Sequence, residues 1–355
     1  MRRRFVRSLR LPMPVLACGL MLAFGAVAAV SAQDAPAPLT SSQTTQVRLR
    51  GLSAVNDQLA WASGVKGTVI RTSDGGTTWQ NVSVPNTDAL DFRDIQAFSA
   101  DEAIVLAAGP GQSSKLYRTV DGGATWTLVL QNLAADGFYD CMVFEGDHGW
   151  MMGDPIEGRY QIFESRDRGA HWAQSANGTP AAKDEAAFAA SGTCIARNRN
   201  STFVATGGAQ ANLHMKVDGM GVWQKFDSGM GRAVSSAGVF SAAPMGERMM
   251  LVGGDYKLEK QPGNAAIYSN GKLKAIPAPP GYRSGVACFA DGERCVAVGP
   301  SGADVWDGKG WRSVSTESWD TVAIAGDSAW MSGVKGRVAR IEQLNATPRA
   351  GDATP

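Results

Sequence analysis

One short pattern occurs three times in this chain, and its regular spacing constrains the fold more than any other feature. The pattern is Ser or Thr, any residue, Asp, any residue, Gly, two further residues and Trp. Asp can accept backbone N–H groups inside its own turn, Gly can adopt a positive φ, and Trp can cover a neighbouring sheet. We therefore expect a hairpin turn at each copy. The residues expected to fix these turns are Asp74, Gly76, Trp79, Asp121, Gly123, Trp126, Asp167, Gly169 and Trp172.

The distance between copies indicates what each repeat contains. Successive Trp residues lie 47 and 46 positions apart, and a degenerate copy ending at Trp223 follows after 51. Repeats of about 40–50 residues are typical of β-propellers, in which each repeat forms one four-stranded blade. Alternating apolar residues and polar turns predict the strands of the second blade over 92–98, 103–108, 115–119 and 125–130. The fold class predicted is therefore all-β, a propeller of four-stranded antiparallel blades.

The two ends of the repeat region indicate how the ring closes. Residues 61–71 of the first blade are nearly repeated by residues 330–340 of the last, after which only one short strand can follow. The outer strand that the last blade lacks is available at the other end, in residues 45–50. We therefore predict seven blades, with this N-terminal strand completing the seventh and leaving no open sheet edge.

The segments outside the repeats indicate export. Basic residues lead into the apolar run 11–30 and a small-residue cleavage site, which predicts a signal peptide over 1–32. Its start resembles a twin-arginine signal, and the ordinary secretory route is the alternative. We predict a flexible linker over 33–45, the propeller over 46–343 and a disordered tail over 344–355. The mature chain is expected to be periplasmic or secreted, monomeric and without a transmembrane segment.

Four cysteines remain after the signal, which suits an oxidising compartment. Cys288 and Cys295 flank a turn that would place them opposite each other in a hairpin, so a disulfide between them is one of two interpretations. Cys141 and Cys194 fall at one position of the inner strand in consecutive blades. They would be bridged or remain as two buried thiols, and we favour the thiols.

The loops opposite the repeated turns gather charged and aromatic residues around one mouth of the channel. Entries into the inner strands and loops between second and third strands share this face, which makes it the default binding site. For any single arginine, pairing with a neighbouring carboxylate competes with ligand contact and is favoured. The predicted binding residues are Arg50, Arg93, Asp94, Tyr139, Asp140, Asp154, Arg159, Asp255, Tyr256, Arg283, Trp319 and Asp320.

The residue content argues against several kinds of chemistry. A net charge of +1 gives no general attraction to nucleic acid. The three histidines, His148, His171 and His214, do not form a convincing metal cluster or serine triad. Because no Gly-rich phosphate loop follows a strand and opens a helix, a nucleotide cofactor is not expected. We predict no cofactor and no metal.

With these residues laid out, the chain resembles the photosystem II stability/assembly factor family, exported propellers with neuraminidase-type (BNR, Asp-box) repeats in the sialidase-like superfamily. The resemblance covers about 46–343. It rests on the repeated boxes, on the lead-in 64–71 and on the blocks 90–95, 187–193, 253–256 and 281–286. It implies a seven-bladed propeller that binds another protein, in photosynthetic members an immature reaction-centre subunit, often through an arginine-rich patch.

Sialidases and xyloglucanases are similar Asp-box propellers, so a glycan-binding or glycoside-hydrolase propeller is the alternative. The sialidase family has six blades and an early Arg-Ile-Pro motif, which is absent here. The xyloglucanase pattern needs two tandem propellers, and this chain has the length for one. We therefore predict a non-catalytic propeller with an assembly or scaffold role for a membrane or exported protein partner, and assign no catalytic residue.

Overall fold

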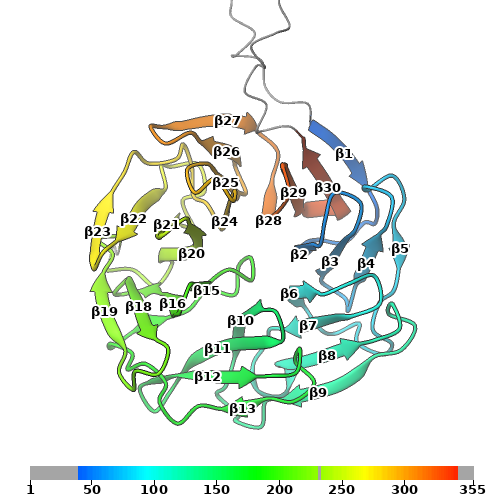
Figure 1. Ribbon diagram of the computed structural model, residues 1–355, viewed down its shortest axis with the longest axis horizontal. Coiled ribbons are helices and arrows are strands. Elements are labelled where there is room, and N and C mark those ends of the chain that lie inside the picture. Colours follow the sequence, from blue (N-terminus) through cyan, green and yellow to red (C-terminus); the bar gives the residue numbers. More distant parts are fainter. Residues whose placement is uncertain (1–38, 231–232, 343–355) are drawn as a thin grey trace, which may run out of the picture. The chain divides into compact units, whose positions relative to one another are not determined.

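The computed structural model describes residues 39–230 and 233–342, which form seven antiparallel sheets arranged as the blades of a ring (Figure 1). This confirms the predicted all-β, seven-bladed propeller. Helical structure among these residues is limited to the short 3-10 turns η2 (Gly111–Ser113) and η3 (Val334–Gly336). Within the same residues no helix has the length and apolar content needed to cross a bilayer. The predicted signal peptide and C-terminal tail lie outside the described residues.

Each blade runs from an inner strand at the channel to an outer strand at the rim. The first three blades are β2 (Leu49–Ala54), β3 (Ala60–Gly64), β4 (Val69–Thr72) and β5 (Gln80–Asn81); β6 (Phe92–Ala97), β7 (Ala103–Ala107), β8 (Lys115–Thr119) and β9 (Thr127–Gln131); and β10 (Tyr139–Glu145), β11 (His148–Ile156), β12 (Arg159–Ser165) and β13 (Ala173–Gln174). The fourth is β15 (Ile195–Asn198), β16 (Ser201–Ala205), β18 (Asn212–Val217) and β19 (Gln224–Asp227).

The remaining blades continue in the same order. The fifth is β20 (Ala237–Met245), β21 (Arg248–Asp255), β22 (Asn264–Ser269) and β23 (Lys272–Ala275), and the short strands β14 (Glu185–Ala186) and β17 (Gly207–Gly208) extend its inner edge. The sixth is β24 (Gly285–Cys288), β25 (Cys295–Gly299), β26 (Gly302–Trp306) and β27 (Trp311–Ser315). The seventh is β28 (Trp319–Ala325), β29 (Ser328–Gly333), β30 (Arg337–Ile341) and β1 (Leu39–Gln43).

An N-terminal strand closes the ring, as predicted, but it lies further upstream than expected. Strand β1 pairs antiparallel with β30, from Leu39 opposite Ile341 to Gln43 opposite Arg337. It therefore lies inside the segment 33–45 that the sequence assigned to a linker, and not at 45–50. The reason is geometric: the chain must pass from the rim of the last blade to the centre of the first before β2 begins, and residues 44–48 span that distance.

The three repeated turns have one hydrogen-bond pattern. The carboxylates of Asp74, Asp121 and Asp167 each accept the backbone N–H of the residue four positions later, at 2.9 Å in each case. The pKa of each aspartate is lowered to about 2. The main cause is a hydrogen bond from the side chain of that later residue, and the second is the backbone hydrogen bond just described. The Gly two residues after each Asp has a positive φ, and the Trp rings of the first two turns pack edge-on against Trp330 and Trp61 of the preceding blade.

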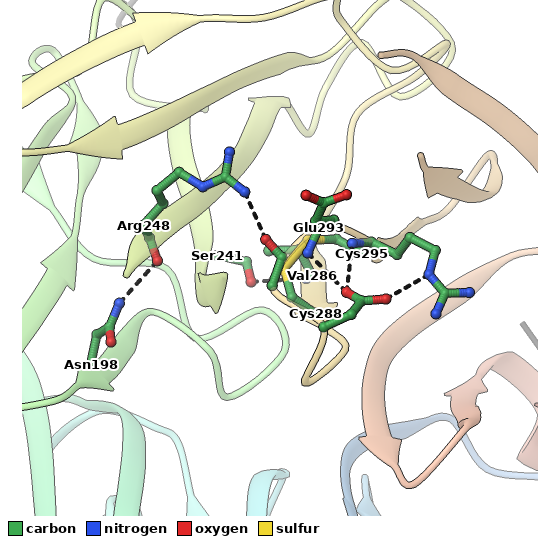
Figure 2. Close-up of a disulfide and its surroundings, with 10 residues drawn as sticks. Asn198, Ser241, Arg248, Val286, Cys288, Glu293 and Cys295 are labelled. Atoms are coloured by element: carbon green, nitrogen blue, oxygen red, sulfur yellow. Dashed lines mark hydrogen bonds and ion pairs between the residues drawn. A yellow bond between two sulfur atoms is a disulfide. The ribbon is translucent and has the colours of Figure 1, made fainter. Parts of the chain in front are cut away.

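Two disulfides join the described cysteines. Cys141 on β10 is bonded to Cys194, just before β15, so the expectation of two buried thiols is wrong. Equivalent inner-strand positions of neighbouring blades are close enough for this, since the two Cα atoms lie 5.9 Å apart. Cys288 and Cys295 form the disulfide that the hairpin allowed, across β24 and β25 (Figure 2).

The surroundings of the second disulfide connect three blades (Figure 2). Arg248 on β21 donates to the carbonyl of Gly292, in the hairpin turn between the two cysteines, at 2.7 Å. Asn198 on β15 donates to the carbonyl of Arg248 at 2.9 Å. Side-chain bonds therefore support the packing between the fourth, fifth and sixth blades, in addition to the apolar residues that fill the interfaces.

A cavity built from β-bulges

A repeated irregularity in the inner strands directs one side chain per blade toward the channel mouth. In five blades the register between the inner and second strands skips one residue, which leaves that residue as the extra member of a β-bulge. A bulge re-aims the side chain of the extra residue. All five of these side chains line one cavity of about 430 Å³. They are Arg50, Arg93, Asp140, Phe240 and Asp320.

The floor of the cavity is the segment 187–193, which we call the plug segment because it joins blades on opposite sides of the ring. It precedes β15 of the fourth blade, yet Arg50 and Arg93 of the first two blades donate to the carbonyl of Ala189 at 3.5 and 3.4 Å. Ser191 donates to a carbonyl of the sixth blade, and Thr321 of the seventh blade donates to the carbonyl of Ser191 at 3.0 Å. The plug segment therefore separates this cavity from a second one, of about 470 Å³, that it also lines.

The arginines of the cavity are only partly neutralised. Arg93 donates from Nε to Asp91 at 2.8 Å, and Arg50 Nη1 lies 3.6 Å from the same carboxylate oxygen. Arg48 donates from Nε to both oxygens of Asp320, at 3.0 and 2.9 Å. Burial lowers the pKa of Arg50, the Arg93 charge lowers it further, and Asp91 opposes both. The buried Nε of Arg50 has no hydrogen-bond partner among the described residues.

Aromatic rings form one wall of the cavity. Phe188 of the plug segment stacks on Phe240, with ring centroids 3.9 Å apart and an interplanar angle of 6°. Tyr282 meets Phe240 edge-on at 4.7 Å, and Tyr256 meets both stacked rings edge-on at 6.3 Å. Since Tyr256 is 43% exposed, it stands at the mouth of the cavity while the other rings lie deeper.

Two carboxyl groups occupy another part of the lining. Asp140 is 1% exposed, and its Oδ2 atom has no hydrogen-bond partner within 39–230 and 233–342. Burial raises the pKa of Asp140 well above its usual value, Asp154 raises it further, and Arg93 opposes this. Burial also raises the pKa of Asp154. The backbone N–H of Ala187 donates to this carboxyl group at 3.1 Å and partly opposes the rise.

Half of the residues predicted from the sequence meet in this cavity. The six that line it are Arg50, Arg93, Asp140, Asp154, Tyr256 and Asp320. Asp255 lies beside Tyr256, and its carboxylate accepts the backbone N–H of Lys257 at 2.9 Å. Arg159 borders a separate hollow and donates to the carbonyl of Gly178 at 3.0 Å.

The other four predicted residues lie elsewhere. Tyr139 and Trp319 are 3% and 0% exposed and belong to the packed core between blades. Asp94 lines the second cavity, beyond the plug segment. Arg283 is 2% exposed and is paired with Asp304 inside the sixth blade, to which its Nε donates at 2.6 Å. It is therefore placed to hold the blade together and not to contact a ligand from this cavity.

Sequence reasoning missed part of the lining. Phe240 occupies the same bulge position in the fifth blade as Arg93 in the second, so an alignment of the blades would have found it. Arg48 and Phe138 lie just before strands, Glu259 lies in the loop between β21 and β22, and none of them belongs to a motif. The plug segment coincides with the block 187–193 that carries part of the family resemblance, but nothing in that block indicates the floor of a cavity. The lining residues missed are Arg48, Phe138, Ala187, Phe188, Ala189, Ala190, Phe240, Glu259, Tyr282, Ser284 and Pro300.

Two solved structures have the same architecture. The structure described as "YCF48 bound to D1 peptide" matches with a TM-score of 0.63 over 86% of this chain and 97% of that chain, at 14% sequence identity. The chain shares the fold of YCF48. YCF48 from Cyanidioschyzon merolae matches with a TM-score of 0.61 over 86% of this chain and 99% of its own, at 16% identity. These likenesses to YCF48 support the resemblance to photosystem II assembly factors at the level of the fold. No protein-family model and no curated protein sequence matches the chain.

Proposed function

We propose that this chain is an exported, non-catalytic propeller that binds a segment of another protein at the cavity, in an assembly or scaffold role. The observation that carries the proposal is the convergence of five bulge residues on one cavity, with arginines along one side and aromatic rings along another. Arg and aromatic side chains are the residues most enriched where proteins bind proteins. The solved structure of YCF48 bound to a D1 peptide gives a precedent for a peptide ligand on this fold.

Exposed apolar side chains beside the cavity enlarge the proposed binding face. Tyr256 and Leu258 are 43% and 44% exposed on the loop after β21. Val234, 42% exposed, lies on the segment whose Ser236 carbonyl accepts the N–H of Tyr256 at 3.1 Å. Neighbouring exposed apolar groups at the edge of a cavity are typical of interaction sites. A protein segment, which covers more surface than a small molecule, fits this arrangement.

The two disulfides support the exported part of the proposal. Disulfides persist in oxidising compartments such as the periplasm and are rare where thiols are kept reduced. The bond between Cys141 and Cys194 joins two blades, and the bond between Cys288 and Cys295 closes a hairpin within one blade. An exported partner, or the exported face of a membrane protein, would be within reach of such a chain.

Affinity purification from the membranes and periplasm of the native host tests the proposal. A C-terminally tagged chain, fixed with a short cross-linker, is compared with Arg93→Glu, which reverses a cavity charge. The matched control is Arg312→Glu, on the exposed outer strand β27, far from the cavity lining. We expect one specific protein to be recovered by the wild type and by the control but not by Arg93→Glu. Equal recovery by all three chains would contradict the cavity as the binding face.

A glycan ligand is the second candidate, and one observation favours it. Asp140, which is buried, and Asp154, which is half-buried, form a pair of carboxyl groups with raised pKa, and glycosidases use a pair of carboxyl groups, one of them protonated. Hydrolysis of fluorogenic glycosides by the wild type, abolished in Asp140→Asn, would replace the non-catalytic proposal. Binding on a glycan array without turnover would indicate a lectin function for the same face.

A further inference from the structure

The acidic part of the cavity contains a buried carboxyl group that no cation of the described chain satisfies. Asp140 is 1% exposed and its Oδ2 has no hydrogen-bond partner there. The guanidinium whose charge influences it, that of Arg93, is directed elsewhere. Its Nε donates to Asp91 at 2.8 Å and its Nη1 donates to the carbonyl of Ala189 at 3.4 Å. An unpartnered buried acceptor of this kind is costly unless a ligand completes it.

The backbone places a second carboxyl group next to the first. Tyr139 on β10 is paired with Gly153 on β11, and the residue after each is the extra member of a bulge, Asp140 on β10 and Asp154 on β11. Asp154 is held by the backbone N–H of Ala187 in the plug segment. Each of these bulges directs a carboxyl group into the same cavity. Two carboxylates placed this close repel each other, which disfavours ionisation of both unless a cation lies between them.

The remaining lining identifies the cation as an organic one. Phe138 and the stacked rings of Phe188 and Phe240 line the same cavity, and such rings cover the apolar stem of a lysine or arginine and attract its charged group. Among the described residues, no group of three His, Cys, Asp or Glu side chains is arranged to hold a metal ion. A cavity of about 430 Å³ has room for one long side chain.

We propose that the acidic part of the cavity, formed by Asp140 and Asp154, is a subsite for one lysine or arginine side chain of the bound protein. This inference rests on the proposed function and names the residue that the partner must supply. The ammonium or guanidinium donates to Asp140 Oδ2, and the aromatic rings cover the stem. The arginines on the other side of the cavity remain available for acceptors of the same partner segment, so the bound segment carries groups of both signs.

Titration of the full mature chain with butylguanidinium and butylammonium, followed by calorimetry, tests the subsite. Butylurea, an uncharged analogue of the same shape, serves as the ligand control. We expect saturable binding of both cations in the millimolar range, no binding of butylurea, and at least tenfold weaker cation binding by Asp140→Asn. Asp88→Asn, at an exposed position before β6, should bind as the wild type does. Cation binding that is unchanged in Asp140→Asn, or equal binding of butylurea, would overturn the inference.

Two further measurements keep the test independent of folding defects and of the proposed function. Asp154→Asn should also weaken cation binding, and the wild type should bind more tightly at pH 8 than at pH 5, because the carboxyl groups must ionise to receive the cation. If the cations fail to bind while the partner protein is still captured, the subsite is wrong and the proposed function stands. If the cations bind but no partner depends on Arg93, the proposed function fails instead.

Discussion

Arg93 and Asp140 are the extra residues of equivalent β-bulges in neighbouring blades, and both side chains line the same cavity without a hydrogen bond between them. The ring repeats one backbone device, and the sequence changes only the side chain that the device presents. Basic, acidic and aromatic groups are therefore brought together without any change in the blade structure. This arrangement separates residues that line the cavity from residues that are packed inside the blades.

Arg93→Ala and Arg283→Ala should distinguish these two groups. The pair of Arg283 and Asp304 is 2% and 0% exposed in its side chains, so removing the cation leaves a buried carboxylate without a partner. We expect Arg283→Ala to lower the free energy of unfolding by about 3–5 kcal/mol. The pair of Arg93 and Asp91 is more exposed, at 27% and 22%, so Arg93→Ala should cost less than about 1 kcal/mol. Chemical denaturation measures both, and equal costs would contradict the assignment.

The plug segment should be sensitive to substitution at Gly192. Gly192 has φ +75°, and an added Cβ would lie 2.3 Å from a carboxylate oxygen of Asp94. Gly158 has nearly the same φ, +74°, but no atom lies within 4 Å of the position that an added Cβ would take. Gly158→Ala therefore measures the backbone strain alone, and Gly192→Ala measures the strain together with the clash. We expect faster hydrogen exchange over 187–193 in Gly192→Ala only; equal exchange in the two variants would show that the plug segment tolerates displacement.

Much of this architecture could be predicted from the sequence because repetition is visible along the chain. The spacing of the boxes predicted the blades, and the similarity of 61–71 to 330–340 predicted closure by an N-terminal strand. Aligning the entries to the inner strands also identified Arg50, Arg93, Asp140 and Asp320, because equivalent positions of successive blades face the same mouth of the channel.

The misses have a common cause, which is that exact strand register and contacts between blades cannot be read from one repeat of the sequence. Arg283 lies one residue before the position equivalent to Arg93: its Cα lies against Gly299 as that of Leu49 lies against Gly64, so its side chain turns into the blade toward Asp304 and Ser284 faces the cavity instead. The plug segment depends on hydrogen bonds to residues of the six other blades, and its own sequence does not reveal those partners. The bridge between Cys141 and Cys194 likewise depends on the spacing between blades, which one repeat does not reveal.

Asp94 should make stability fall with rising pH between about 4 and 8. Burial raises the pKa of Asp94 to about 8, although hydrogen bonds from the backbone N–H groups of Met142 and Ile95 lower it in part. An unfolded aspartate loses its proton near pH 4, so between these values the folded state holds a proton that the unfolded state has released. The stability contributed is complete below pH 4 and is lost as the pH rises toward 8.

Asp94→Asn isolates this effect, because asparagine does not titrate. Relative to the variant, the wild type should lose free energy of unfolding as the pH rises across this window, by up to about 1.4 kcal/mol per pH unit. Above pH 8 the difference between the two proteins should stay constant. Urea denaturation at pH 4.5, 6, 7.5 and 9 gives the difference directly. A difference that does not change with pH would mean that Asp94 is ionised throughout in the folded state.

The two disulfides should contribute unequally to stability. The bond between Cys141 and Cys194 closes a loop with a sequence separation of 53, and the bond between Cys288 and Cys295 one of 7. Chain entropy predicts that the longer loop stabilises more, by about 4 kcal/mol against about 2.5 kcal/mol. The double Ser variant of each pair, compared by denaturation under oxidising conditions, measures the two contributions, and reduced wild type provides the limit at which both are lost. Because Cys194 directly follows the plug segment, its loss should also raise hydrogen exchange over 187–193, which loss of the 288–295 bond should leave unchanged. Greater destabilisation by removal of the short-loop bond would show that local strain, and not loop closure, determines what these disulfides contribute.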